Sequence, residues 1–159
     1  MEAIVVRPWR PEDGPAAAEL IRGILNEEFG FATTRADLGD VEHNAYGDGL
    51  WVAEDDGCIV GTIALLVYGE THGALRRMFV APDRRGAGLG IGQALMESLL
   101  AQARLRDLDD VSLGTLAKFD RALGFYAKNG YVQIPRNALP SGFPAMPLED
   151  IFCRLDLRA

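Results

Sequence analysis

The stretch MFVAPDRRGAGLGIGQALM, residues 78–96, carries the strongest structural signal in the chain. It joins a short apolar run, an Ala-Pro-Asp turn, two arginines and glycines at positions 86, 88, 90 and 92. Apolar residues at helical spacing follow it and predict a helix over 88–105. A glycine-rich turn before a helix presents main-chain N–H groups without a Cβ to block a ligand. Arg84 and Arg85 would add positive charge there. The stretch therefore predicts an anion site, and specifically a pyrophosphate site.

The composition bounds the class of protein. The 159 residues suit one domain, residues 1–159, and an apolar share of 48% with 25% charged residues is that of an ordinary globular protein. The net charge of −7 argues against a nucleic-acid partner and slightly favours a cationic acceptor. No apolar run has membrane-spanning length and no secretory signal begins the chain, so we expect no membrane partner and a cytoplasmic location.

Metal and thiol chemistry are not expected. Cys58 and Cys153 lie far apart in apolar runs, where buried thiols are the better interpretation than a disulfide or a nucleophile. His43 and His72 have no metal-ligand spacing, so the sequence predicts no metal site.

Apolar patterning predicts the order of the secondary structure. A strand comes first, then a helix from a cap at Asp13 to about residue 29, a short helix and three strands. The glycine loop with its helix follows, and then a strand, a helix and two final strands. The strands are expected over residues 3–7, 50–53, 58–67, 74–80, 111–115, 131–134 and 151–157, and the remaining helices over 38–46, 88–105 and 119–128. The fold class is α/β, with one mixed, mostly antiparallel central sheet and helices on both faces.

Two motifs resemble the GCN5-related N-acetyltransferase (GNAT) superfamily. The acetyl-CoA loop of that family, R/Q-x-x-G-x-G/A, is matched at residues 85–90, and its FYxKxG(F/Y) signature is matched at 125–131. An RPxxPxD pattern at 7–13 is also similar. The resemblance implies a GNAT-like fold and an N-acetyltransferase that moves an acetyl group from acetyl-CoA to a primary amine of a small molecule or peptide, by direct attack in a ternary complex. Small relatives also form dimers, so a homodimer is compatible with it.

The resemblance assigns the donor site residue by residue. Main-chain groups of Met78, Phe79 and Val80 would pair with the pantetheine arm like an added strand. The loop would hold the pyrophosphate through a set of residues that runs from the arginines to the helix start: Arg84, Arg85, Gly86, Ala87, Gly88, Leu89, Gly90 and Ile91. A second register, centred on Gly90 and Gly92, stays open. The first leaves Arg85 three residues before Gly88 and puts Leu89 on the apolar stripe of the helix.

Tyr126 is the catalytic candidate, because the family places this tyrosine where its hydroxyl reaches the cofactor sulfur. A neutral phenol can protonate a departing thiolate. The base is not identified: Glu54, Glu70, His72 and an ordered water are all candidates. Where many relatives have an asparagine, this chain has Phe119, so one polar contact to the cofactor is expected to be missing.

The acceptor pocket is expected from residues 30–46 and the proline-rich stretch 135–148, where Phe143 and Met146 would line an apolar cleft. A dinucleotide site of the Rossmann type is disfavoured, because the glycine spacing is G-x-G-x-G-x-G rather than G-x-G-x-x-G. The alternative function is a non-catalytic acyl-CoA sensor of the same fold, although the tyrosine argues against it.

Overall fold

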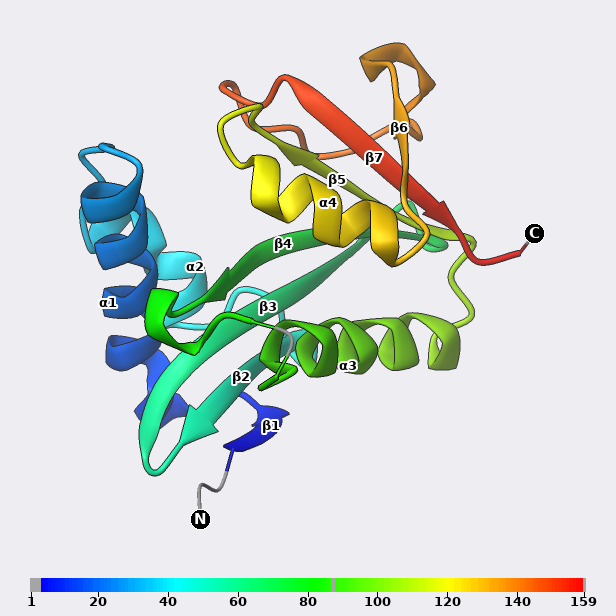
Figure 1. The fold of residues 1–159 in the computed structure, drawn as a ribbon. Helices are drawn as coiled ribbons and strands as arrows, with labels where there is room; N and C mark the ends of the chain where they lie inside the picture. Colours follow the sequence, from blue (N-terminus) through cyan, green and yellow to red (C-terminus); the bar gives the residue numbers. More distant parts are fainter. Residues whose placement is uncertain (1–3, 87, 159) are drawn as a thin grey trace. The chain divides into compact units, whose positions relative to one another are not determined.

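The computed structural model describes residues 4–86 and 88–158, which fall into two compact units. The first unit contains residues 1–65 and 77–102, and the second contains 66–76 and 103–159. Seven strands follow the order β1-β2-β3-β4-β5-β7-β6 in one sheet. The pairs β1–β2, β2–β3, β5–β7 and β6–β7 are antiparallel, whereas β4 and β5 are parallel. The mixed, mostly antiparallel α/β fold predicted from the sequence is therefore confirmed (Figure 1).

The strands begin and end within a few residues of their predicted limits. Their bounds are β1 Ile4–Pro8, β2 Leu50–Asp55, β3 Cys58–Tyr68, β4 His72–Val80, β5 Asp110–Thr115, β6 Val132–Ile134 and β7 Ile151–Asp156. The β2–β3 hairpin turns at Asp56 and Gly57, both with positive φ (51° and 84°). Asp-Gly is a preferred pair for such a turn, since its backbone twist matches that of the strands.

Helices cover both faces of the sheet in the first unit. The helix α1 (Gly14–Gly23) continues into a π-helical turn at Ile24–Glu28, and the short α2 (Gly39–Glu42) follows later in the chain. Buried residues of α1 and α2 pack against Val52 of β2. The helix α3 (Ile91–Leu105) crosses the other face, where Leu95 lies so close to Gly61 of β3 that an added Cβ would stand 3.0 Å from it (Figure 1).

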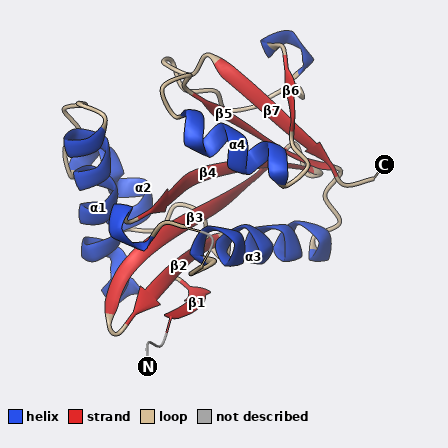
Figure 2. Cartoon of the chain, viewed as in Figure 1, coloured by secondary structure: helices blue, strands red, loops and turns tan. Residues whose placement is uncertain are grey.

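The second unit is built on β5 and β7, which pair over six positions. Side chains alternate between the two faces of these strands. On one face, Gly130 beyond the end of α4 (Asp120–Lys128) lies against Leu155 of β7. On the other face, Phe152 contacts Phe143 from the segment between β6 and β7. Figure 2 shows that segment as loop apart from one short turn, as its four prolines predict.

Three expectations for single residues are wrong. Asp13 does not cap α1 with its side chain; its carboxylate accepts hydrogen bonds from Arg7 and from the main-chain N–H of Arg10 instead. Cys58 is exposed, because it lies at the hairpin end of β3, while Cys153 is buried as expected. Leu89 is also exposed, since α3 begins two residues after it.

No helix in the described part of the chain is long and apolar enough to cross a bilayer.

Candidate active site

The glycine loop has the geometry of a ligand cradle. After a 3-10 turn at Pro82–Arg84, the chain passes through Gly86 (φ 127°) and Gly90 (φ 67°), and α3 starts at the next residue. Among the described residues, an ideal Cβ at Gly86, Gly88 or Gly90 would meet no atom within 4 Å, so the space beside these glycines is open. Such a loop before a long helix fits a phosphate group. Ala87, also assigned to the cofactor, lies outside the described residues.

The start of α3 bears on the two glycine registers. The helix begins at Ile91, so Gly92 lies inside it rather than in the loop. Gly86 and Gly90, which flank the first register, have the positive φ angles that glycine supports without strain. This arrangement favours the register of residues 85–90.

Carboxylates hold both arginines of the loop. Arg84 binds the buried Asp55 at 2.7 Å from its Nε and also Asp83. Arg85 forms a bidentate ion pair with Glu28 at 2.7 and 2.8 Å, and its Nε donates to the carbonyl oxygen of Val80 at 2.9 Å. The positive charge that the sequence suggests for this loop is therefore balanced within the first unit.

The edge of β4 is the second feature of the candidate site. Its ladder with β5 runs over three residue pairs, from His72 to Ala74, whereas β4 itself continues to Val80. At Arg77 the strand takes a left-handed conformation (φ 53°) that is rare for a residue with a side chain. The Arg77 guanidinium binds Asp40 at 2.9 and 3.0 Å, which holds this irregularity in place. The half-buried residues 78–80 follow it directly.

Tyr126 lies on α4 in the second unit and is buried. Its ring packs at an angle to those of Phe125 and Tyr131, with centroids 6.1 and 5.8 Å away. Burial raises the pKa of the Tyr126 hydroxyl above its ordinary value of 10.0. The side chain therefore stays protonated at neutral pH, which is the state that a proton donor needs.

The three side chains considered as the base occupy different places. Glu54 binds the Arg7 guanidinium at 2.7 Å. His72 hydrogen-bonds the fully buried Asp110 through Nδ1 at 2.9 Å. Glu70 has a left-handed backbone (φ 72°) and is exposed in the β3–β4 turn. Glu54 belongs to the first unit, whereas Glu70 and His72 belong to the second.

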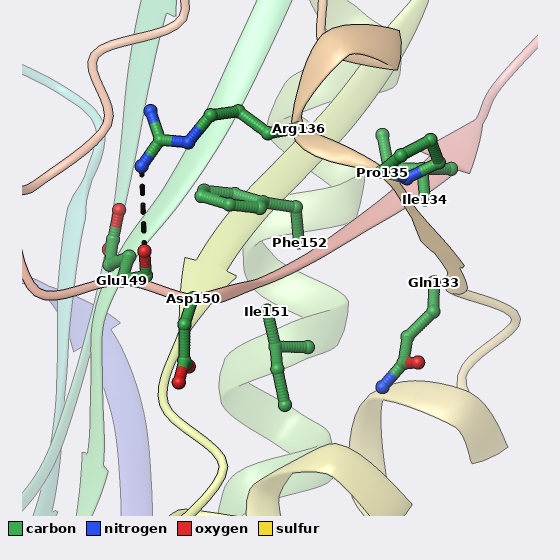
Figure 3. A pocket seen from close by; sticks show the side chains of 8 residues that line it. All are labelled: Gln133, Ile134, Pro135, Arg136, Glu149, Asp150, Ile151 and Phe152. Atoms are coloured by element: carbon green, nitrogen blue, oxygen red, sulfur yellow. Dashed lines mark hydrogen bonds between the residues drawn. The ribbon is translucent and has the colours of Figure 1, made fainter.

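A cavity of about 370 Å³ lies at the two ends of the proline-rich stretch, lined by residues 133–136 and 149–152 (Figure 3). The Arg136 guanidinium lies over the Phe152 ring, 4.9 Å from its centroid, and donates a long hydrogen bond of 3.5 Å to the carbonyl oxygen of Glu149. The Phe143 ring packs edge to face against the Phe152 ring, with centroids 6.4 Å apart. Met146 is exposed, and residues 30–46 belong to the first unit.

Glu149 is a residue of this cavity that the sequence does not indicate. Its carboxyl accepts a hydrogen bond from the main-chain N–H of Met146 at 2.8 Å and lies directly over Gly114, where any side chain would collide with it. Burial raises the pKa of this carboxyl above its ordinary value of 4.5, against the opposing effects of Met146, Arg76 and Arg136. No motif surrounds Glu149 in the sequence, so only the folded chain reveals its position over Gly114.

Comparison with known proteins identifies the family. The model of the acetyltransferase (GNAT) domain matches residues 47–133. A Bacillus subtilis (strain 168) protein, S-(2-succino)cysteine N-acetyltransferase, is 33% identical over 119 residues, which are 70% of this chain and 72% of that protein.

Solved structures agree with this result. A GNAT-family acetyltransferase from Staphylococcus aureus Mu50 superimposes with a TM-score of 0.89 at 32% identity, over 98% of this chain and 100% of the other. The Mycobacterium tuberculosis protein Rv2747, solved in complex with CoA, gives a TM-score of 0.65 at 27% identity, over 86% and 76%. The chain belongs to the GNAT superfamily and is an acetyl-CoA-dependent N-acetyltransferase.

Proposed function

We propose that this enzyme acetylates the primary amine of a small molecule by direct attack within a ternary complex. The observation that carries the proposal is the open glycine loop at the start of α3, next to a β4 strand that extends past its ladder with β5. Acetyl-CoA, when bound, supplies a thioester whose carbonyl carbon accepts the amine. A small acceptor is supported by the name of the B. subtilis relative, which acts on a modified amino acid.

The loop and β4 would hold the donor through main-chain groups. N–H groups between Arg85 and Ile91 would bind the pyrophosphate, where glycine leaves room for its oxygens. Main-chain groups of residues 78–80 would bind the pantetheine arm as an added strand. The Val80 carbonyl already accepts a hydrogen bond from Arg85, so this contact links the loop to the strand.

Tyr126 would donate the proton that the departing thiolate requires. Its buried hydroxyl remains neutral at physiological pH, so it can donate a hydrogen bond to the thiolate as the thioester breaks, although a phenol is a weaker acid than a thiol.

A test of the proposal measures thiol release from acetyl-CoA with a panel of amines, and thermal unfolding with and without acetyl-CoA. At 100 times its Kd, acetyl-CoA should stabilise the fold by about 2.7 kcal/mol, which raises Tm by roughly 5–10 °C. Thiol release should require both an amine and the intact Tyr126. A covalent acetyl-enzyme, detected by mass spectrometry before the amine is added, would contradict direct transfer.

Three expectations continue as part of this proposal. The enzyme works in the cytoplasm, its two units act as one domain, and it is compatible with a homodimer. Cell fractionation, the cooperativity of unfolding and the mass in solution test them in turn.

A further inference from the structure

Two arginines of the second unit differ from most arginines of this protein. Most of the guanidiniums that form hydrogen bonds or ion pairs in the described part of the chain bind carboxylates, as those of Arg7, Arg77 and Arg85 do. Arg76 instead donates to the carbonyl oxygen of Pro144 at 3.4 Å and to the Met146 sulfur at 3.2 Å. Arg136 donates to the Glu149 carbonyl at 3.5 Å and stacks on Phe152. Among the described residues, neither guanidinium has a carboxylate oxygen within 4.0 Å.

These two guanidiniums converge on one short segment. Arg76 reaches residues 144–146 from β4, and Arg136 reaches residue 149 from the turn after β6. Both lie near enough to the Glu149 carboxyl to favour its ionised form. The long distances to neutral acceptors leave most of the hydrogen-bonding capacity of each guanidinium unused.

The remaining groups of the cavity leave its positive side open. Figure 3 shows the Asp150 carboxylate extending away from the Arg136 guanidinium, while the Phe152 ring lies beneath it. Stacking on an aromatic ring fixes the plane of a guanidinium and leaves its edge N–H groups available. Such an edge suits the two oxygens of a carboxylate.

We propose that Arg136 and Arg76 bind a carboxylate of the acceptor, so that this enzyme selects amines that also carry a carboxylate, such as amino acids. The inference rests on the proposed function, and it names the substrate class of the same active site. It also reverses the slight preference for a cationic acceptor that the net charge of −7 suggests, because the arginines act locally.

The experiment compares two acceptors that differ in one carboxylate: S-methylcysteine and its decarboxylated analogue, 2-(methylthio)ethylamine. S-(2-succino)cysteine is a third probe with two more carboxylates. We expect kcat/KM to be at least about tenfold higher for S-methylcysteine than for the analogue, as a charge-assisted hydrogen bond to a carboxylate implies. A preference for the analogue would overturn the inference.

Substitutions of the two arginines then test whether they bind the carboxylate of the acceptor. Arg136→Gln and Arg76→Gln should each raise the KM for S-methylcysteine by about 10- to 100-fold, and each should raise the KM for 2-(methylthio)ethylamine much less. Arg136→Lys should restore part of the loss, since it keeps the charge without the planar fork. The matched control is Arg158→Gln, which removes a guanidinium bound to Asp109 in the same unit. Equal losses for both acceptors would show that the arginines only support the fold.

Glu149→Gln separates this inference from its rival. If the arginines bind a carboxylate, removal of the neighbouring negative charge should tighten binding of S-(2-succino)cysteine several-fold. The rival is a cavity that binds only the ammonium group of the acceptor, through Glu149. The same variant would then weaken binding of S-methylcysteine and 2-(methylthio)ethylamine equally, and the inference would be wrong.

Binding measurements keep the two proposals distinguishable. Calorimetric titration of S-(2-succino)cysteine into the enzyme with CoA detects the carboxylate site without turnover. Failure of every amine to release thiol would contradict the proposed function. Thiol release with no carboxylate preference, or no heat in the titration, would contradict only the carboxylate site.

Discussion

The glycine loop of the first unit contains two arginines, and two more, Arg76 and Arg136, contact the segment 144–149 of the second unit, but the two pairs are held in opposite ways. Carboxylates bind Arg84 and Arg85 at 2.7–2.9 Å, whereas neutral groups bind Arg76 and Arg136 at 3.2 Å or more. The adjacent pair in the motif looks like the cationic site in the sequence, yet its charge is already balanced. The two separated arginines are the ones with unused donors. The presence of an arginine in a motif therefore does not show whether its guanidinium is free to bind a ligand.

In our two proposals, main-chain groups bind the donor and side-chain guanidiniums bind the acceptor. In the loop, glycine N–H groups can bind phosphate without help from the arginines. In the cavity, the planar guanidinium over Phe152 supplies the charge. Variants of the two regions should therefore change the kinetic constants of different substrates, and the predictions below test this from the largest effect to the smallest.

The largest effect is expected for Tyr126→Phe, which changes neither the glycine loop nor the two arginines of the second unit. It should lower kcat by about 100-fold or more while the Kd for acetyl-CoA is retained, because only the proton donor is lost. Steady-state kinetics and calorimetry measure the two constants. Tyr131→Phe, which removes a hydroxyl from the neighbouring buried ring, is the control and should retain most of the turnover. Unchanged turnover in Tyr126→Phe would remove this residue from the mechanism.

Gly90→Val tests the donor side. A β-branched residue is strained at φ 67°, so the loop should rearrange and the KM for acetyl-CoA should rise about tenfold or more, with little change in the KM for the acceptor. Gly47→Val imposes comparable strain at φ 62°, also in open space, but away from the loop. It should lower Tm without changing either KM. An unaltered KM for acetyl-CoA in Gly90→Val would show that the donor does not depend on this turn.

Glu28→Gln tests whether the charge of Arg85 can be made available. Loss of the carboxylate leaves the guanidinium unbalanced next to the loop, and acetyl-CoA should bind about two- to fivefold tighter, the range of a partly exposed ion pair. Calorimetry at two salt concentrations measures this. Glu19→Gln, which breaks the ion pair with Arg22, is the control and should have no effect. Weaker binding would mean that Glu28 positions Arg85 for the donor.

The smallest effect concerns pH. Burial raises the pKa of Glu149, so its ionisation is disfavoured in the folded protein, and this contribution to stability is present below pH 4.5 and lost as the pH rises through the folded pKa. Acidification towards that pKa also removes a negative charge beside Arg76 and Arg136. S-(2-succino)cysteine should therefore bind tighter, by up to about threefold, as the pH falls through the folded pKa of Glu149. Glu149→Gln should abolish this difference, and tighter binding at the higher pH would contradict the assignment.

Local patterns predicted most of the fold. Periodicity placed the helices and strands, Asp56-Gly57 marked the first hairpin, and Asn129-Gly130 marked the end of α4. Each of these signals depends on residues within one turn or one strand, so the sequence contains the whole cause. The π-helical turn at Ile24–Glu28 has no such local signal, and the sequence predicts it only as a continuation of the first helix.

Contacts between residues far apart in the sequence could not be predicted from such local patterns. Asp13 looked like a helix cap, but the Arg7 guanidinium binds its carboxylate at 2.8 Å and holds its pKa below the ordinary value. Glu149 gave no signal, because its importance comes from Gly114 on a paired strand and from Arg76 far back in the chain. The distances between these residues in the folded protein cannot be predicted from their order in the sequence.

The sequence by itself determined the family, the glycine loop and the tyrosine, because each is a continuous run whose backbone conformation follows from its own residues. The tertiary structure decided which charges are balanced and which are available. Arg85 and Glu28 are 57 residues apart in the chain, and only the packing of the chain brings the carboxylate of Glu28 to the guanidinium of Arg85 and leaves Arg136 without a carboxylate among the described residues.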